Sequence, residues 1–149
     1  MTSDRQPGPP HSLVQLGWRA CYAQQLTLED LDAAFPARVS GVHRNRIDVL
    51  HEGGESSVTL PPLLLVEGEA RVTVGYWVLV EAQAPRVMRL LDRASLIARV
   101  AAGSDRREQP IAANLDTLFV VTSCNADFNP SRLERYLSIA FEAHIEPVI

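Results

Sequence analysis

The chain contains no lysine, and all 14 of its basic residues are arginines. A P-loop needs a lysine that reaches the phosphates of its nucleotide. The guanine-reading motif of GTPases needs a lysine as well, and a Schiff-base enzyme uses one as its nucleophile. The absence of lysine therefore excludes all three kinds of site from these 149 residues.

Cysteine is scarce too. Cys21 and Cys124 lie far apart in the sequence, so they form no metal-binding pair, and nothing supports a disulfide between them. Cys124 has no base near it in the sequence, and we expect a buried or inert thiol there rather than a nucleophile. The four histidines show no ligand spacing, which argues against a metal site; they are His11, His43, His51 and His144. We expect a reducing cytoplasm as the compartment of this chain.

Long apolar runs are also missing. No run approaches the roughly 18 apolar residues that a membrane-spanning helix needs, so we expect no membrane association. The first residues, 1–11, contain three prolines and no apolar segment, which indicates a disordered tail rather than a secretory signal. The apolar fraction of 46% is typical of a globular chain.

Short strand patterns fill residues 33–92. Apolar and polar residues alternate from Ala37 to Val42, and Gly53-Gly54 marks a hairpin. The strongest strand pattern runs from Val72 to Val80, with a bend at Gly75; neighbours on a strand face opposite ways, so we expect Trp77 in the core and its neighbour exposed. About five short strands in roughly 60 residues predict a small closed barrel of the OB or SH3-like kind, and we expect an OB-type five-stranded barrel.

The segments on either side of this region have other patterns. Residues 1–32 hold the tail and a helical segment, in which Thr27 followed by Asp30 is close to a capping box. Leu28 and Leu31 are predicted to face inward. Residues 93–110 are rich in arginine and have the composition of a linker.

Residues 111–149 read as a βαβ unit. Thr117 to Thr122 is a β-branched apolar run of the kind that forms a strand buried on both faces. Asn129-Pro130 opens a helix, and Pro147 is predicted to end it, before a second strand at Val148-Ile149. One face of the helix would carry Leu133, Leu137, Ala140, Phe141 and His144. Because a parallel pair needs cover on both faces, we interpret this segment as the incomplete start of an α/β domain. An appendage folded back on the first domain is the alternative.

The run Ile111-Ala112-Ala113-Asn114-Leu115-Asp116-Thr117 is long and specific, and Asp127-Phe128-Asn129 and Arg132 to Leu137 follow it. These motifs resemble the RsgA family, the ribosome small-subunit-dependent GTPase A. Upstream, Leu16-Gly17-Trp18, Pro36 to Val39 and Val74 to Val78 resemble the family's N-terminal and barrel motifs. The resemblance covers about residues 13–149. The family usually has Asp where this chain has Tyr76, which leaves the role of that Asp open.

The resemblance implies a three-part protein: an OB barrel that contacts rRNA of the small ribosomal subunit, a circularly permuted P-loop-like GTPase domain, and a small zinc-binding domain. It implies GTP, magnesium and zinc for the full-length protein. None of their binding residues maps onto this chain, which we expect to be the N-terminal portion only, inactive alone and without catalytic residues. We expect a cytoplasmic monomer whose partner is the small ribosomal subunit.

The candidate RNA-binding residues are Arg38, His43, Arg44, Arg46, Tyr76, Arg86 and Arg89. Arginine can fork onto phosphates and stack on bases, and an aromatic ring can stack on a base. Residues 33–110 hold ten arginines against nine acidic residues, which is no basic footprint. The residues alone therefore favour solvated arginines, whereas the resemblance favours RNA contacts. The alternative function is a stand-alone OB module that binds single-stranded nucleic acid or a protein partner.

Overall fold

The computed structural model describes residues 11–66, 69–70, 72–100, 108–124 and 128–149. The chain divides into two compact units, residues 1–92 and 93–149. The tail expected over the first ten residues lies outside the described residues. No helix in the described part of the chain is both long and apolar enough to cross a membrane.

The first unit begins with two short helices, α1 (Ala20–Ala23) and α2 (Leu28–Ala33). The capping box predicted at the start of α2 is confirmed. The Thr27 hydroxyl accepts the Asp30 N–H at 3.2 Å, and the Asp30 carboxylate accepts the Thr27 N–H at 2.9 Å. The predicted orientation of the helix is wrong, because Leu28 is 83% exposed and Leu31 is 63% exposed.

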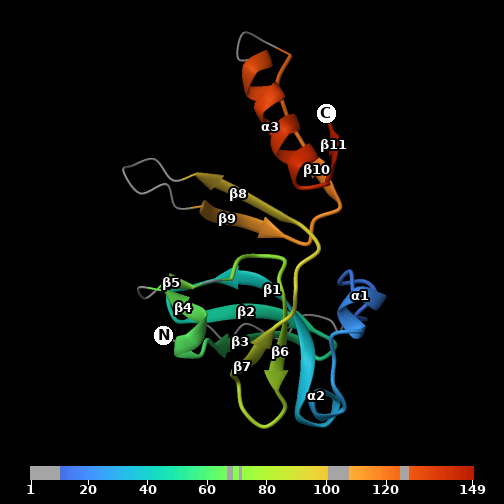
Figure 1. Cartoon of the computed structure of the whole chain (residues 1–149), viewed down its shortest axis with the longest axis vertical. Coiled ribbons are helices and arrows are strands. Elements are labelled where there is room, and N and C mark those ends of the chain that lie inside the picture. The colour runs from blue at the N-terminus through green and yellow to red at the C-terminus, as the bar shows by residue number, and fades with distance from the viewer. Residues whose placement is uncertain (1–10, 67–68, 71, 101–107, 125–127) are drawn as a thin grey trace. The chain divides into compact units, whose positions relative to one another are not determined.

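A five-stranded antiparallel sheet follows the helices. Its strands are β1 (Ala34–Val42), β2 (Arg46–His51), β3 (Gly54–Thr59), β6 (Trp77–Glu81) and β7 (Val87–Leu90). They are arranged in the order β3-β2-β1-β6-β7 (Figure 1). The two edge strands approach each other where the Thr59 N–H donates to the Pro85 carbonyl at 2.8 Å and Thr59 forms a parallel bridge with Arg86. The sheet therefore curls until its edges meet, and the predicted number of strands is confirmed.

The connection between β3 and β6 contains short elements. They are a 3₁₀ turn, η1 (Pro62–Leu64), and a two-stranded pair formed by β4 (Leu65–Val66) and β5 (Glu69–Ala70). The proline pair at residues 61–62 ends the β3 segment, because proline has no N–H to continue a strand ladder.

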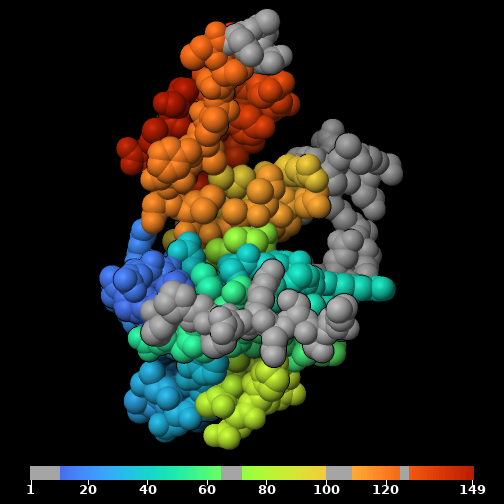
Figure 2. Space-filling model, turned by 180° about the vertical axis from the view of Figure 1, so that it is seen from behind, coloured from blue at the N-terminus to red at the C-terminus, as the bar shows by residue number. Residues whose placement is uncertain are grey.

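Both faces of the sheet carry buried apolar side chains. On one face the alternating residues of all five strands are at most 2% exposed; they are Ala37, Val39, Ile47, Val49, Val58, Val78, Val80 and Val87. On the other face Trp77 and Leu79 pack against Leu16 and Tyr22 of the N-terminal segment. This segment, in blue, lies directly against the strands in the space-filling view (Figure 2). The prediction that Trp77 lies in the core is confirmed, since it is fully buried.

Tyr76 is buried, and the prediction that it lies exposed is wrong. Gly75 adopts a φ of +92°, which favours glycine, and the chain turns there, so the bend predicted at this residue is confirmed. Val39 bridges the turn, accepting the Gly75 N–H and donating to the Tyr76 carbonyl, both at 2.9 Å. Strand β6 starts only at Trp77, so the alternation of a regular strand does not apply to Tyr76.

The second unit contains a hairpin and a βαβ unit. The hairpin pairs β8 (Leu96–Val100) with β9 (Glu108–Ala113). Residues 93–110, which have the composition of a linker, thus hold β8 and the first part of β9. In the βαβ unit, β10 (Thr117–Phe119) and β11 (Glu146–Val148) pair in parallel, and α3 (Pro130–Glu142) connects them. The predicted crossover is confirmed.

Helix α3 begins as predicted but ends earlier. The Asn129 side chain accepts the Arg132 N–H at 3.0 Å, and Pro130 occupies the first turn. The helix ends before Pro147, because His144 adopts a φ of +56° and the Ile145 N–H donates back to the Ala140 carbonyl at 2.8 Å. This is a Schellman motif with histidine in the position that glycine usually takes.

A small core holds the second unit together. It consists of Ile97 from β8 and of Ala140 and Ile145 at the end of α3. The prediction that the first strand is buried on both faces is wrong, since Phe119 is 71% exposed. Phe141, predicted on the buried face of α3, is exposed as well, and so is His144. Only one described strand, β11, pairs with β10, and a two-stranded sheet has too few neighbours to cover both faces.

Candidate nucleic-acid interface

The structure separates the predicted RNA-binding residues into two groups. Arg38, Tyr76 and Arg89 lie against the interior of the first unit. The side chains of His43, Arg44, Arg46 and Arg86 lie on its exposed surface. Whether any of them contacts RNA stays a prediction, but the side chains of the second group are the more exposed: Arg86 is 59% and His43 46% exposed, against 37% for Arg89.

Arg89 attaches the N-terminal segment to the sheet. Its Nη2 donates to the Gln25 carbonyl and to Asp30 Oδ2, both at 2.6 Å. The hydrogen bond from Arg89 and the one from the Thr27 backbone lower the pKa of Asp30 to about 2. Since the Asp30 side chain is buried, Arg89 is committed to this ion pair and is a poor candidate for RNA contact.

Arg38 also attaches the N-terminal segment to the sheet. Its Nη1 donates to the Leu16 carbonyl, and its guanidinium lies 6.0 Å from the centre of the Trp77 ring. Gly17 makes room for it, because a Cβ at residue 17 would lie 2.7 Å from Arg38 Nη1. Arg38 therefore fixes the N-terminal segment over Trp77.

Two of the exposed arginines lie in one cross-strand row. Arg46 of β2 pairs with Thr59 of β3, and Thr59 bridges Arg86 just before β7. Directly paired residues project from the same face of a sheet, and neighbouring strands lie about 4.8 Å apart, so the two arginines are separated by about 10 Å at their Cα atoms. All three side chains are exposed. We call Arg46, Thr59 and Arg86 the arginine row.

Thr59 was not predicted from the sequence. Its hydroxyl donates to the Pro85 carbonyl at 3.2 Å, and it separates the two arginines. No local sequence pattern marks Thr59. Its position follows from the register of β2 and β3, which sets Arg46 opposite Thr59.

Arg86 already has an anionic partner. Its Nε and Nη2 donate to Glu81 Oε1 at 2.9 and 2.6 Å. The Arg86 side chain is still 59% exposed, so the remaining guanidinium N–H groups can reach an outside acceptor. Exposed pairs of this kind contribute little free energy, and a phosphate can therefore compete with Glu81.

The turn of the β1–β2 hairpin adds further basic groups beside the row. The His43 N–H donates to the Arg46 carbonyl at 2.9 Å, and the Leu60 N–H donates to the Asn45 carbonyl at 3.1 Å, which ties the turn to the end of β3. His43 Nε2 lies 2.9 Å from Asp48 Oδ2, and this hydrogen bond lowers the pKa of Asp48. Arg44 is exposed in the turn itself. The row and the turn thus bring three exposed arginines, Arg44, Arg46 and Arg86, to one surface, on which Glu81 pairs with Arg86 and Asp48 with His43.

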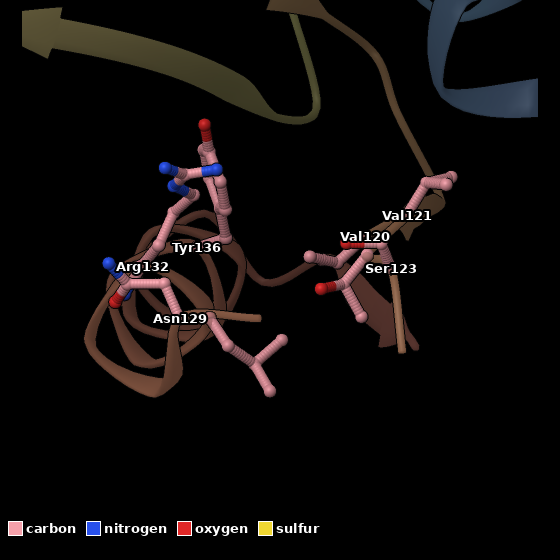
Figure 3. A pocket seen from close by; sticks show the side chains of 8 residues that line it. Val120, Val121, Ser123, Asn129, Arg132 and Tyr136 are labelled. Carbon is pink, nitrogen blue, oxygen red and sulfur yellow. The ribbon is translucent and has the colours of Figure 1, made fainter. Parts of the chain in front are cut away.

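The second unit contains a cavity of about 290 Å³ between the end of β10 and the first two turns of α3 (Figure 3). It is lined by Val120, Val121, Thr122, Ser123, Asn129, Arg132, Leu133 and Tyr136. In Figure 3 Val120, Val121 and Ser123 lie on one side of it, and Asn129, Arg132 and Tyr136 lie on the helix side. No glycine lines it, so it lacks the backbone cradle that holds phosphate in a P-loop.

The cysteines and histidines form no reactive centre in the described part of the chain. Cys124 is a free, exposed thiol, so of the two expected alternatives, a buried or an inert thiol, the buried one does not apply; Cys21 is free and exposed as well. The residues that the structure describes contain no group of three or more His, Cys, Asp or Glu side chains that could hold a metal ion.

Known proteins match this chain closely in sequence. A family model described as RsgA GTPase matches residues 90–149. The Small ribosomal subunit biogenesis GTPase RsgA 2 of Vibrio vulnificus is 48% identical over 140 residues, which cover 94% of this chain and 38% of that protein. The Small ribosomal subunit biogenesis GTPase RsgA of Mesorhizobium japonicum is 45% identical over 138 residues, or 93% of this chain and 38% of that protein. The chain thus spans about two fifths of the length of these relatives.

Two solved structures are similar in fold. YjeQ from Thermotoga maritima matches 76% of this chain and 39% of its own with a TM-score of 0.54 and 19% identity. YloQ, whose title describes a circularly permuted GTPase, matches 78% of this chain and 39% of its own with a TM-score of 0.52 and 18% identity. At these identities the likeness concerns the fold alone.

Proposed function

The chain belongs to the RsgA GTPase family, and from this premise we propose that its first unit docks the protein on rRNA of the small ribosomal subunit during late maturation. The relatives are named small ribosomal subunit biogenesis GTPases, which supports the subunit as the partner. Such a protein would act as a cytoplasmic monomer.

We infer that the five-stranded sheet is an OB-type barrel. The strand order β3-β2-β1-β6-β7 and the meeting of its edge strands at Thr59 support this reading. OB barrels commonly bind oligonucleotides through strand faces and loops. The arginine row crosses neighbouring strands and the β1–β2 turn lies at its end, which supports the binding of an oligonucleotide across these strands and this turn.

The single observation that carries the proposal is the arginine row. Arg46 and Arg86 project from one face about 10 Å apart, with a small hydroxyl-bearing side chain between them. A guanidinium binds phosphate through two parallel N–H groups. Two such groups on either side of Thr59 can hold two phosphates of one RNA strand, with Arg44 as a further contact.

GTP, magnesium and zinc belong, in this proposal, to parts of the protein other than the residues of this chain. The chain has no lysine for a P-loop or a guanine-reading motif, and its described residues offer no cluster of metal ligands. The residues present therefore do not fit these groups. We expect the 149-residue chain to bind RNA weakly and to hydrolyse no GTP, and measurable GTP turnover by the purified chain would contradict this.

The docking proposal is tested by measuring binding of the chain to purified small ribosomal subunits over a range of salt concentrations. Phosphate contacts make binding weaken as salt rises. The double variant Arg46→Gln/Arg86→Gln should bind more weakly and reduce the slope of log affinity against log salt by about two, one for each lost phosphate contact.

Arg135→Gln is a control for each single substitution, because it removes one positive charge from the exposed surface of α3. It should leave the salt slope unchanged. A double variant that binds with the same slope as the wild type would contradict docking through the arginine row. Binding insensitive to salt would favour a protein partner instead.

A further inference from the structure

Two leucines of α2 project into solvent. Leu28 is 83% exposed and Leu31 is 63% exposed. They are three positions apart, so they are neighbours on one face of the helix. We call Leu28 and Leu31 the leucine ridge. Single exposed leucines are ordinary on protein surfaces, but two side by side on a helix that is held rigidly form a candidate contact surface.

The helix is fixed in the orientation that exposes the ridge. Asp30 closes the capping box with Thr27 and pairs with Arg89 at 2.6 Å, while Arg89 also binds the Gln25 carbonyl. At the other end the Ala82 N–H donates to the Ala33 carbonyl at 2.9 Å. Turning α2 to bury the leucines would break the Asp30–Arg89 pair and leave a charged group without its partner. The exposure is therefore a consequence of specific contacts.

The surroundings of the ridge are acidic. Glu29 and Asp32 are exposed on the same short helix, whose sequence contains no basic residue. Asp30 pairs with Arg89, whereas Glu29 and Asp32 form no ion pair with the residues that the structure describes. Carboxylates repel the phosphates of RNA, so this surface suits a ligand that carries apolar side chains together with positive charge.

We propose that the leucine ridge binds a basic protein of the small ribosomal subunit, so that the first unit contacts RNA through the arginine row and protein through α2. This rests on the proposed function, because it takes the subunit as the partner. Ribosomal proteins of this kind would place apolar side chains against Leu28 and Leu31 and basic ones against Glu29 and Asp32, which gives both burial and charge complementarity.

The direct test replaces Leu28 with a photoreactive phenylalanine analogue and irradiates the chain bound to purified small subunits. The expected product is an adduct with a basic ribosomal protein, which protease degrades and ribonuclease does not. An adduct with rRNA would overturn the proposal, and so would the absence of any adduct while the chain stays bound.

Affinity measurements separate this proposal from RNA docking. Leu28→Gln/Leu31→Gln keeps good helix formers and should lower affinity for small subunits about tenfold or more, while Val14→Thr, at another exposed position of the N-terminal segment, should leave it unchanged. Glu29→Gln/Asp32→Asn should also weaken binding if the partner is basic.

The outcomes are distinguishable. A leucine double variant that binds like the wild type, while Arg46→Gln/Arg86→Gln binds weakly, overturns only the protein contact. A wild-type chain that does not bind small subunits at all overturns both proposals. Because the leucines are exposed, the variants should unfold at the same urea concentration as the wild type, which rules out misfolding as the cause.

Discussion

The two units of the chain differ in how completely their strands bury apolar side chains. In the first unit the sheet buries residues on both faces, and Trp77 and the alternating valines are almost completely shielded from water. In the second unit Phe119, Val121 and Phe141 remain exposed, and the core consists mainly of Ile97, Ala140 and Ile145. The difference follows from the topology of the two sheets.

An antiparallel sheet that curls until its edges meet pairs its own strands and encloses its own core. A parallel pair connected by one helix is covered on one face at most, and it depends on further elements for the other face. We therefore expect the first unit to be stable by itself, whereas the second unit buries few apolar side chains through its own contacts. Three predictions test this contrast.

The largest effect is expected at Trp77. Its ring is fully buried and packs against Trp18, with ring centres 4.7 Å apart, and against Tyr22 at 5.9 Å. Trp77→Ala should lower the free energy of unfolding of the first unit by about 3–5 kcal/mol, because it opens a large cavity. Urea unfolding followed by circular dichroism measures the loss.

Two comparison variants sharpen the result. Trp77→Phe should cost much less, because the Trp77 Nε1–H has no hydrogen-bond partner among the described residues and its removal leaves no group unsatisfied. Phe141→Gln in the second unit should change stability by no more than about 0.5 kcal/mol, since this aromatic ring is exposed. Equal losses in the free energy of unfolding from Trp77→Ala and Phe141→Gln would contradict the difference between the units.

The second prediction concerns the pH dependence of the first unit. The Arg89 hydrogen bond, with the Thr27 backbone, lowers the pKa of Asp30 from 3.8 to about 2 in the folded chain. As the pH falls, Asp30 therefore becomes protonated at a higher pH in the unfolded chain than in the folded chain. The contribution to stability is complete above about pH 5 and disappears as the pH falls towards 2.

Asp30→Asn removes the charge and keeps an oxygen that can accept the Thr27 N–H. The variant should be less stable than the wild type near neutral pH, and the two should converge as the pH approaches 2. Urea midpoints measured from pH 6 downwards give the difference. A difference that stays constant down to pH 2.5 would contradict the ion pair as its source.

The smallest effect is expected at two left-handed residues of the second unit. His144 adopts a φ of +56° at the end of α3, and His144→Gly should stabilise that unit by about 1 kcal/mol or less, because glycine adopts this conformation without strain. Asn114 has a similar φ of +55°, but its Oδ1 accepts the Ala94 N–H at 2.8 Å.

Asn114→Gly should therefore destabilise the unit by about 1 kcal/mol, because the lost hydrogen bond outweighs the relief of strain. Thermal unfolding of both variants measures whether each one raises or lowers the stability of the unit. If both raise it or both lower it, the strain at His144 and the hydrogen bond of Asn114 do not have the opposite effects predicted here.

Local signals in the sequence were sufficient to predict local structure. Thr27 and Asp30 predicted the start of α2, and Asn129-Pro130 predicted the start of α3, because capping depends on residues within one turn. The turn-punctuated strands predicted five strands in the first unit, and the parallel pair joined by α3 was predicted from its apolar run and helix pattern.

Long-range contacts explain what the sequence did not predict. The orientation of α2 depends on the pair between Asp30 and Arg89, 59 positions apart, and the burial of Tyr76 depends on the turn at Gly75. The arginine row exists only because register sets Arg46 beside Thr59 and closure sets Thr59 beside Arg86. No local pattern carries this information.

We propose that the first unit is a self-contained module that docks on the small ribosomal subunit through the arginine row. Hydrogen exchange of the chain, measured with and without purified small subunits, tests this docking. The amides around Arg46, Thr59 and Arg86 should gain protection, and residues 93–149 should not change. Protection gained only in residues 93–149, or none at all in bound chain, would contradict it.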